Sequence, residues 1–112
     1  MTDKVVVLVT CSGLREAQKL ARALVDIRLV ACVNITSPVE SVYRWEGKVE
    51  KAREFLLLMK TTRELFGEVQ STIRKIHSYT TPEILCLPVV DGSTDYLRWV
   101  TDSVKEPSRS EE

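Results

Sequence analysis

The sequence predicts an α+β domain in the ferredoxin-like order β-α-β-β-α-β, with one further helix near the C-terminus. Short apolar runs rich in β-branched residues, which are typical of strands, alternate with longer segments whose apolar residues recur at helical spacing. A chain of 112 residues has room for one hydrophobic core. We therefore expect a single domain over residues 1–104 and a polar, disordered tail over residues 105–112.

The first half of the chain predicts a strand, a helix and one arm of a hairpin. Residues 5–9 form a continuous apolar run that is typical of a buried strand. Ser12 is a candidate N-cap for the amphipathic helix that follows, which we expect to end near Arg28. Strand character returns over residues 29–45, with a bulge or bend at Pro38.

The second half predicts the other hairpin arm, two helices and a last strand. Glu46-Gly47 is a candidate hairpin turn. We expect Thr62 to cap the second helix, and Pro88 to place the last strand at a sheet edge, because proline cannot donate to a ladder. The strands and the third helix are expected at residues 48–59, 84–90 and 94–104.

The strands are apolar on both faces, which predicts self-association. Two right-handed crossovers place both main helices on one face of the sheet, and a sheet covered on one side should alternate apolar and polar residues. Residues 5–9 and 55–59 do not alternate. The third helix is too short to cover four strands, so we expect a neighbouring subunit to cover the second face.

The hairpin gives an independent reason to expect association. A domain of this size has a radius of gyration of about 13 Å. Hairpin arms of roughly 13–15 residues would extend some 40–50 Å. The tip, near Tyr43, Trp45 and Glu46, should therefore overhang its own domain and lie on another subunit, since an isolated two-stranded ribbon is marginally stable in water.

Composition excludes several functional classes. Lys plus Arg and Asp plus Glu each number 16, so the net charge is zero and gives no sign of nucleic-acid or membrane-surface binding. The first apolar run is too short for a signal peptide, and we expect a cytoplasmic protein. The cysteines Cys11, Cys32 and Cys86 are widely spaced, which argues against a disulfide framework or a zinc knuckle.

Motifs of catalysis are also lacking. The sequence has no Gly-rich phosphate loop, HExxH motif or nucleophile elbow, and one histidine. A small hydrolase or lyase would have to build its site around that histidine, with Thr80 and Thr81 as nearby hydroxyls. We therefore expect a protein that is not an enzyme.

Several short blocks resemble the CutA divalent-cation tolerance family over about residues 4–104. They are Val30-Ala31-Cys32-Val33-Asn34, Ser41 to Lys48, Lys60-Thr61, His77-Ser78-Tyr79, Pro82-Glu83-Ile84 and Tyr96-Leu97-Arg98-Trp99. The resemblance implies a homotrimer of ferredoxin-like subunits, a role in copper and divalent-cation tolerance, and no catalytic activity. The chain departs from the family at Ser78, where proline is common, and at Val9, where some members carry a cysteine.

The expected metal ligands are His77, Cys11 and Glu54, for Cu²⁺ or another divalent cation. His77 could instead be structural, at the end of the second helix. Cys11 precedes a helix N-terminus, where a thiol pKa can be lowered, whereas Cys32 and Cys86 are expected to act as small apolar residues. Glu54 could instead be a solvated charge at a strand end.

A second set of residues is expected to line a ligand pocket or a subunit interface. These residues are Tyr43, Trp45, Lys60, Tyr79, Glu83 and Trp99. Aromatic residues fill interfaces more often than they line pockets. The sequence therefore supports two functions: a homotrimer that binds copper, another divalent cation or a small ligand near its interfaces, or a trimeric signalling or structural protein that binds an organic ligand or a protein partner.

Overall fold

The computed structural model describes residues 1–107. The sheet is antiparallel, with the order β2-β4-β1-β5, and β3 pairs with the far end of β4. The elements are β1 (Lys4–Cys11), α1 (Leu14–Asp26), β2 (Cys32–Ile35), β3 (Val39–Trp45), β4 (Lys48–Thr62), a 3-10 turn η1 (Arg63–Leu65), α2 (Phe66–Ile76), β5 (Ile84–Pro88) and α3 (Thr94–Ser103). The expected α+β class and element order are confirmed.

The first helix lies slightly inside its expected bounds. Gly13 rather than Ser12 is the N-cap, and no side chain caps the helix. Helix α1 ends at Asp26, because Arg28 adopts a left-handed φ of 62° and the N–H of Leu29 bonds back to a carbonyl of the helix. Residues 29–31, expected to open the second strand, are therefore a buried loop, and the rest of the expected strand is divided around Pro38 into β2 and β3.

The later boundaries also differ from expectation in detail. Strand β4 continues through Thr62 into η1, so Thr62 does not cap α2; Leu65 is its N-cap, with no side-chain bond. The expected edge position is confirmed, since within residues 1–107 β5, which ends at Pro88, pairs with β1 alone. The hydroxyl of Ser93, a cap that the sequence analysis does not predict, accepts a hydrogen bond from the N–H of Tyr96 and caps α3.

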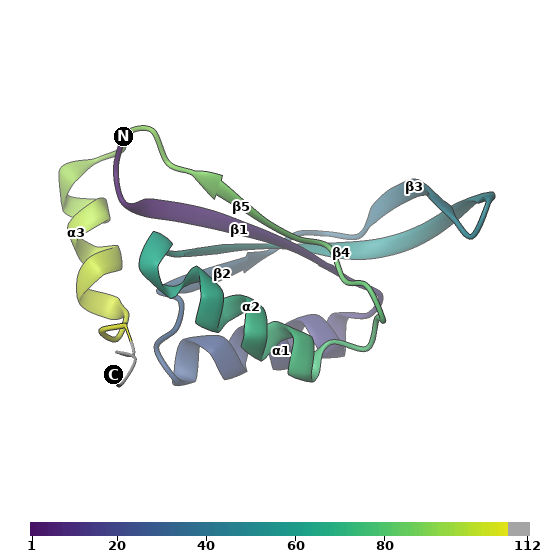
Figure 1. Cartoon of the computed structure of the whole chain (residues 1–112), viewed down its shortest axis with the longest axis horizontal. Coiled ribbons are helices and arrows are strands. Elements are labelled where there is room, and N and C mark those ends of the chain that lie inside the picture. The colour runs from purple at the N-terminus through teal and green to yellow at the C-terminus, as the bar shows by residue number, and fades with distance from the viewer. Residues whose placement is uncertain (108–112) are drawn as a thin grey trace, which may run out of the picture.

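Helices α1 and α2 cover one face of the sheet, and the core lies between these helices and the sheet (Figure 1). Alternate residues of β1 and β4 point into it, because successive strand residues face opposite sides. The fully buried side chains there include Val5, Val7, Val9, Leu20, Leu24, Leu57, Met59 and Ile73. The hydroxyl of Thr61 donates to the carbonyl of Leu29 and so pairs the loop that follows α1.

The opposite face of the sheet is apolar over β1, β4 and β5, and among residues 1–107 a helix reaches it only at one end, where the hydroxyl of Tyr96 lies 3.5 Å from Sγ of Cys32. Leu8 stands directly between Leu58 on β4 and Leu85 on β5. At the edge, Leu85 is 52% exposed and Leu87 is 44% exposed. Helix α3 lies at the end of the sheet away from the hairpin (Figure 1). The expected two-sided apolar strands are therefore present, and within the described part of one chain the second face stays open.

Strands β3 and β4 form a hairpin that extends well beyond the helices (Figure 1). Its turn has positive φ at both central residues, 48° at Glu46 and 81° at Gly47, as a tight hairpin turn with matching twist requires. The chain measures 42 × 36 × 25 Å, with a radius of gyration of 14.8 Å. The expected overhang is present.

The start of the expected tail is held against the domain. The N–H of Lys105 donates to the carbonyl of Arg28 at 2.8 Å, and its ammonium pairs with Glu68 at 2.8 Å. Residues 108–112 of that tail lie outside the described residues. Between residues 1 and 107, no helix has the length and apolar character needed to cross a membrane.

Candidate functional site

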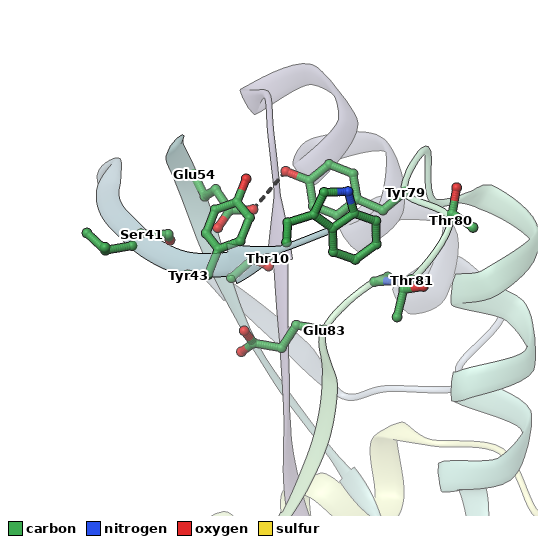
Figure 2. Close-up of a pocket in the computed structure, with 11 residues that line it drawn as sticks. Thr10, Ser41, Tyr43, Glu54, Tyr79, Thr80, Thr81 and Glu83 are labelled. Carbon is green, nitrogen blue, oxygen red and sulfur yellow. Dashed lines mark hydrogen bonds between the residues drawn. The ribbon is translucent and has the colours of Figure 1, made fainter. Parts of the chain in front are cut away.

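A cavity of about 640 Å³ lies where the hairpin leaves the sheet (Figure 2). Its walls come from the end of β1, from β3, from β4 and from the loop between α2 and β5. The residues that line it are Thr10, Ser41, Val42, Tyr43, Trp45, Glu54, Tyr79, Thr80, Thr81, Pro82 and Glu83. We call this cavity the Glu54 pocket.

The change of partners along β4 creates the pocket. Phe55 of β4 pairs with Cys11, the last residue of β1, whereas Glu54 pairs with Val39, the first residue of β3. One strand thus passes from the covered sheet into the free hairpin between two neighbouring residues. The alternation of side chains along β4 then places Glu54 beside the aromatic residues of β3.

Glu54 is a nearly buried carboxylate without a cationic partner among the described residues. It is 7% exposed, and its Oε2 accepts a hydrogen bond of 2.7 Å from the hydroxyl of Tyr79. No Lys, Arg or His within residues 1–107 forms an ion pair with it. Among residues 1–107, the lining includes a second carboxylate, Glu83, and no basic residue. The pocket is therefore anionic and lacks the positive charge that normally accompanies a buried carboxylate.

Tyr79 is the main polar contact of Glu54 inside the chain. Burial, followed by the hydrogen bond to Glu54 and the charge of that carboxylate, raises the pKa of Tyr79 well above its ordinary value. The hydroxyl therefore remains protonated and keeps donating to the carboxylate. Figure 2 shows Tyr79 and Tyr43, from opposite walls, extending toward Glu54.

His77 is enclosed directly behind Tyr79. Its side chain has no exposed surface. The N–H of Tyr79 donates to Nδ1 at 3.0 Å, so Nδ1 carries no proton and Nε2 donates to the carbonyl of Thr10 at 2.7 Å. Both ring nitrogens of this neutral imidazole are engaged within the chain. This geometry favours the structural alternative for His77.

A carboxylate from helix α1 supports the same loop. Glu16 accepts the N–H of Ser78 at 2.7 Å, and its Oε2 lies 3.8 Å from Nδ1 of His77. The rings of His77 and Tyr79 are in tilted contact, with centroids 4.8 Å apart. Helix α1 and His77 therefore fix the position of Tyr79, and through it the position of Glu54.

Cys11 lies beside His77 in the core, with its Sγ 3.8 Å from Nε2. Burial, and then the negative charges of Glu16 and Glu54, raise the pKa of the thiol to about 12. The expected lowering of this pKa is therefore wrong. The physical reason is that Cys11 is still part of β1 and points into the core, so the helix N-terminus does not offset the cost of burying a thiolate.

The three expected metal ligands do not form one cluster. His77 and Cys11 are adjacent in the core, while Glu54 faces the pocket on the other side of Tyr79. Within residues 1–107, no group of three or more His, Cys, Asp or Glu side chains is placed to hold a metal ion. The three cysteines are all free.

The second set of expected residues divides into two groups. Tyr43, Trp45, Tyr79 and Glu83 all line the Glu54 pocket. Lys60 and Trp99 do not. The ammonium of Lys60 bonds to the side-chain oxygen of Asn34, and the Trp99 ring contacts Tyr96 on α3, with centroids 5.5 Å apart.

Two of the lining hydroxyls are not among the site residues that the sequence predicts. Thr10 and Ser41 line the pocket together with Thr80 and Thr81. Thr10 carried a usable signal, because it is the first polar residue after the apolar run of β1 and so marks the end of the covered sheet. Ser41 opens one of the blocks that resemble the family, but its place beside the pocket depends on how β3 pairs with β4.

Comparisons with known proteins agree on one family. The family model described as CutA1 divalent ion tolerance protein matches residues 5–103. A Divalent-cation tolerance protein CutA of Thermus thermophilus is 43% identical over 98 residues, which cover 88% of this chain and 95% of that protein. A solved Thermus thermophilus structure with that description has a TM-score of 0.89 at 41% identity, covering 91% of this chain and 99% of its own. The Archaeoglobus fulgidus structure, described as a periplasmic divalent cation tolerance protein, has a TM-score of 0.88 at 39% identity, covering 91% and 99%.

Proposed function

Because the chain belongs to the CutA1 divalent ion tolerance family, we propose that it acts as a homotrimer that binds cations in the Glu54 pocket. Cation binding there is its contribution to divalent-cation tolerance. The names of its relatives describe tolerance and not a reaction, and the proposed activity is binding without catalysis.

The open apolar sheet face supports assembly. Leu8, Leu58 and Leu85 stand side by side across three strands, and a surface of this kind is typical of a protein–protein interface. The overhanging hairpin, with Trp45 44% exposed near its tip, also extends away from the body of its own chain as Figure 1 shows it. The number of three subunits is what the family resemblance implies.

The single observation that carries cation binding is the nearly buried carboxylate of Glu54, which has no ion pair within residues 1–107. Removing a carboxylate from water is costly unless a positive charge accompanies it. A cation that enters from solvent would supply that charge, with Glu83 at the same pocket as a second anionic group.

The donor atoms of the pocket indicate which divalent cations fit. Carboxylate and hydroxyl oxygens line it, and these suit hard cations such as Mg²⁺, Mn²⁺ and Ca²⁺. Copper prefers nitrogen and sulfur, which this region offers only at His77 and Cys11. Those two side chains are enclosed and face each other, so the pocket fits copper less well than a hard cation.

Titration calorimetry of the untagged protein tests the proposal. We expect Mn²⁺ to bind, and Glu54→Gln to weaken that binding by about tenfold or more, since even outer-shell changes at metal sites cost that much. The matched control is Glu64→Gln, because Glu64 is an exposed carboxylate outside the pocket. Equal Mn²⁺ affinity in parent and Glu54→Gln would overturn the proposed site. Tight Cu²⁺ binding that His77→Asn abolishes would move the metal site to the core.

Sedimentation tests the assembly separately. We expect a particle of about three times the chain mass of 12.7 kDa at micromolar concentration. Leu85→Glu, which puts a charge on the open sheet face, should dissociate it. A folded monomer in the parent protein would contradict the trimer.

We also propose a cytoplasmic location, a reducing compartment in which the free thiols of Cys11, Cys32 and Cys86 would stay reduced. The Archaeoglobus fulgidus relative, by contrast, is described as periplasmic. Fractionation of the native host with an antibody to this chain would decide between the two compartments.

A further inference from the structure

We propose that the Glu54 pocket accepts organic ammonium ions, meaning alkylamines and quaternary ammonium compounds, as well as divalent metal ions. This inference rests on the proposed role of the pocket as a cation site, and it names a second class of cation for that site. Glu54 is the counter-ion, and the rings of Tyr43, Trp45 and Tyr79 are the walls.

The size of the pocket is the first reason. A volume of about 640 Å³ falls in the range of roughly 300–1,000 Å³ that is usual for small-molecule sites. A single metal ion with its water ligands fills a small part of such a space. A cation that carries its own alkyl groups fills much more of it and brings apolar surface to the apolar lining residues Val42 and Pro82.

The aromatic composition of the wall is the second reason. Three of the eleven lining residues are aromatic, and two carry a carboxylate. The face of an aromatic ring is the negative part of its quadrupole, so rings around a pocket attract ammonium groups, and aromatic cages are a known solution for quaternary ammonium. A strongly hydrated divalent ion gains little from such walls, because it dehydrates reluctantly.

The hydrogen bond inside the pocket leaves these walls available. The hydroxyl of Tyr79 donates to Glu54 at 2.7 Å, and Tyr79 is itself part of the pocket lining. Tyr43 and Trp45 are 42% and 44% exposed, although they line a cavity. Within one chain this accessible surface can contact a ligand that enters from solvent, and part of it would face a neighbouring subunit in the assembly proposed above.

The position of the charge fits an ammonium head group. The carboxylate of Glu54 lies at the base of β3, where Tyr79 and the hairpin aromatics meet. An ammonium group placed there would neutralise the carboxylate and contact the rings at once. The hydroxyls of Thr10, Ser41, Thr80 and Thr81 offer acceptors for the N–H groups of a primary amine.

Calorimetry on the untagged protein with two matched probes tests this inference. The probes are choline and 3,3-dimethyl-1-butanol, which has nearly the same shape and no charge. We expect choline to bind, and the neutral isostere to bind at least about tenfold more weakly, because cation–π attraction and the counter-ion act on charge alone. Putrescine should bind as a primary-amine representative, and Mn²⁺ should compete with both cations.

Matched variants separate the contribution of the aromatic wall to binding from the contribution of the Glu54 carboxylate. Trp45→Leu should weaken choline at least tenfold and leave Mn²⁺ affinity unchanged, whereas Trp45→Phe should retain most choline binding because it keeps a ring. Trp99→Leu is the control, since Trp99 is 45% exposed, like Trp45, and lies outside the pocket. Glu54→Gln should weaken both classes of cation. Sedimentation of each variant checks that its assembly matches that of the parent.

The outcomes distinguish this inference from the proposed function. Binding of Mn²⁺ without choline, or equal binding of choline and its neutral isostere, would overturn the ammonium inference and leave the metal proposal standing. Binding of choline without any divalent ion would support the inference and overturn the metal proposal. If neither choline nor Mn²⁺ binds and the assembly of Glu54→Gln dissociates, both the metal proposal and the ammonium inference are overturned. Dissociation would show that a cation of a neighbouring subunit pairs with Glu54.

Discussion

Two polar clusters lie back to back across Tyr79, and they differ in how completely their groups are paired. In the core, His77 uses both ring nitrogens and Cys11 keeps its proton. In the pocket, Glu54 has a hydroxyl for a partner and no cation among the described residues. The core cluster has the residue types of a metal site, but its polar groups are already paired. The pocket instead holds a buried carboxylate without a counter-ion among the described residues. A buried polar group that lacks a partner is a better indicator of a ligand site than residue type alone.

The largest test of this contrast removes the imidazole of the core cluster. His77→Ala leaves the carbonyl of Thr10 and the N–H of Tyr79 without their partner and opens a cavity. We expect the free energy of unfolding to fall by about 3–5 kcal/mol, as judged from the usual cost of unpaired polar groups and core cavities. Denaturant unfolding at fixed protein concentration measures it.

A conservative variant makes the same test sharper. In His77→Asn, the amide oxygen can still accept the N–H of Tyr79, so we expect about half of the loss to be recovered. A change below about 1 kcal/mol in His77→Ala would mean that the core cluster is not structural.

The second test uses the pKa of Cys11. Because burial raises this pKa from 9.0 to about 12 in the folded chain, the unfolded chain releases the thiol proton first as the pH rises above 9. The stabilising contribution of the thiol is complete below pH 9 and is lost between pH 9 and about 12.

We expect deprotonation of the thiol in the unfolded chain to lower the free energy of unfolding by up to about 1.4 kcal/mol per pH unit in that window. Cys11→Ala should lose less stability than the parent between pH 9 and pH 10, measured by denaturant unfolding at each pH. Cys86→Ala is a useful comparison, since burial also raises the pKa of Cys86. Parallel pH profiles for the parent and Cys11→Ala would contradict a protonated thiol in the core.

The smallest expected effect has the opposite sign, and it concerns the pocket. Glu54→Gln keeps an oxygen for the hydroxyl of Tyr79 and removes a buried charge that has no counter-ion within residues 1–107. In the absence of added cations we expect this variant to be more stable than the parent by about 1 kcal/mol, because functional groups held without partners reduce stability. Thermal unfolding in chelator-treated buffer measures the difference.

A loss of stability in Glu54→Gln would show that the carboxylate is paired in the assembled protein. The exposed site variant Glu64→Gln controls for the general effect of losing one negative charge. A loss of stability in His77→Ala and a gain in Glu54→Gln would distinguish a residue that stabilises the fold from a residue that binds a ligand.

The sequence predicts the order of elements well, because strong local patterns determine it. The valine run of β1, the helical spacing in α1 and the Glu46-Gly47 turn each act over a few residues. Boundaries that depend on tertiary bonds were less predictable. The end of α1 depends on a left-handed Arg28, and the end of β4 depends on pairing with β1 as far as Thr62.

The candidate site was predictable in composition more than in arrangement. The family resemblance and the hairpin indicated Tyr43, Trp45 and Tyr79, and these residues do share a pocket. That Cys11 faces the core while Glu54 faces the pocket depends on strand register, which no local pattern in the sequence specifies. The raised pKa of Cys11 follows from that register.

Strand β4 runs without interruption for 15 residues from the hairpin into the helix-covered sheet, and this limits where the chain can gain or lose a residue. Inserting or deleting one residue just after Glu54 would move every later side chain of β4 to the other face of the sheet. Leu57 and Met59 would then leave the core. The hairpin can accept insertions at its turn, around Glu46-Gly47, whereas one residue added within β4 would need a β-bulge to keep the later side chains on their faces.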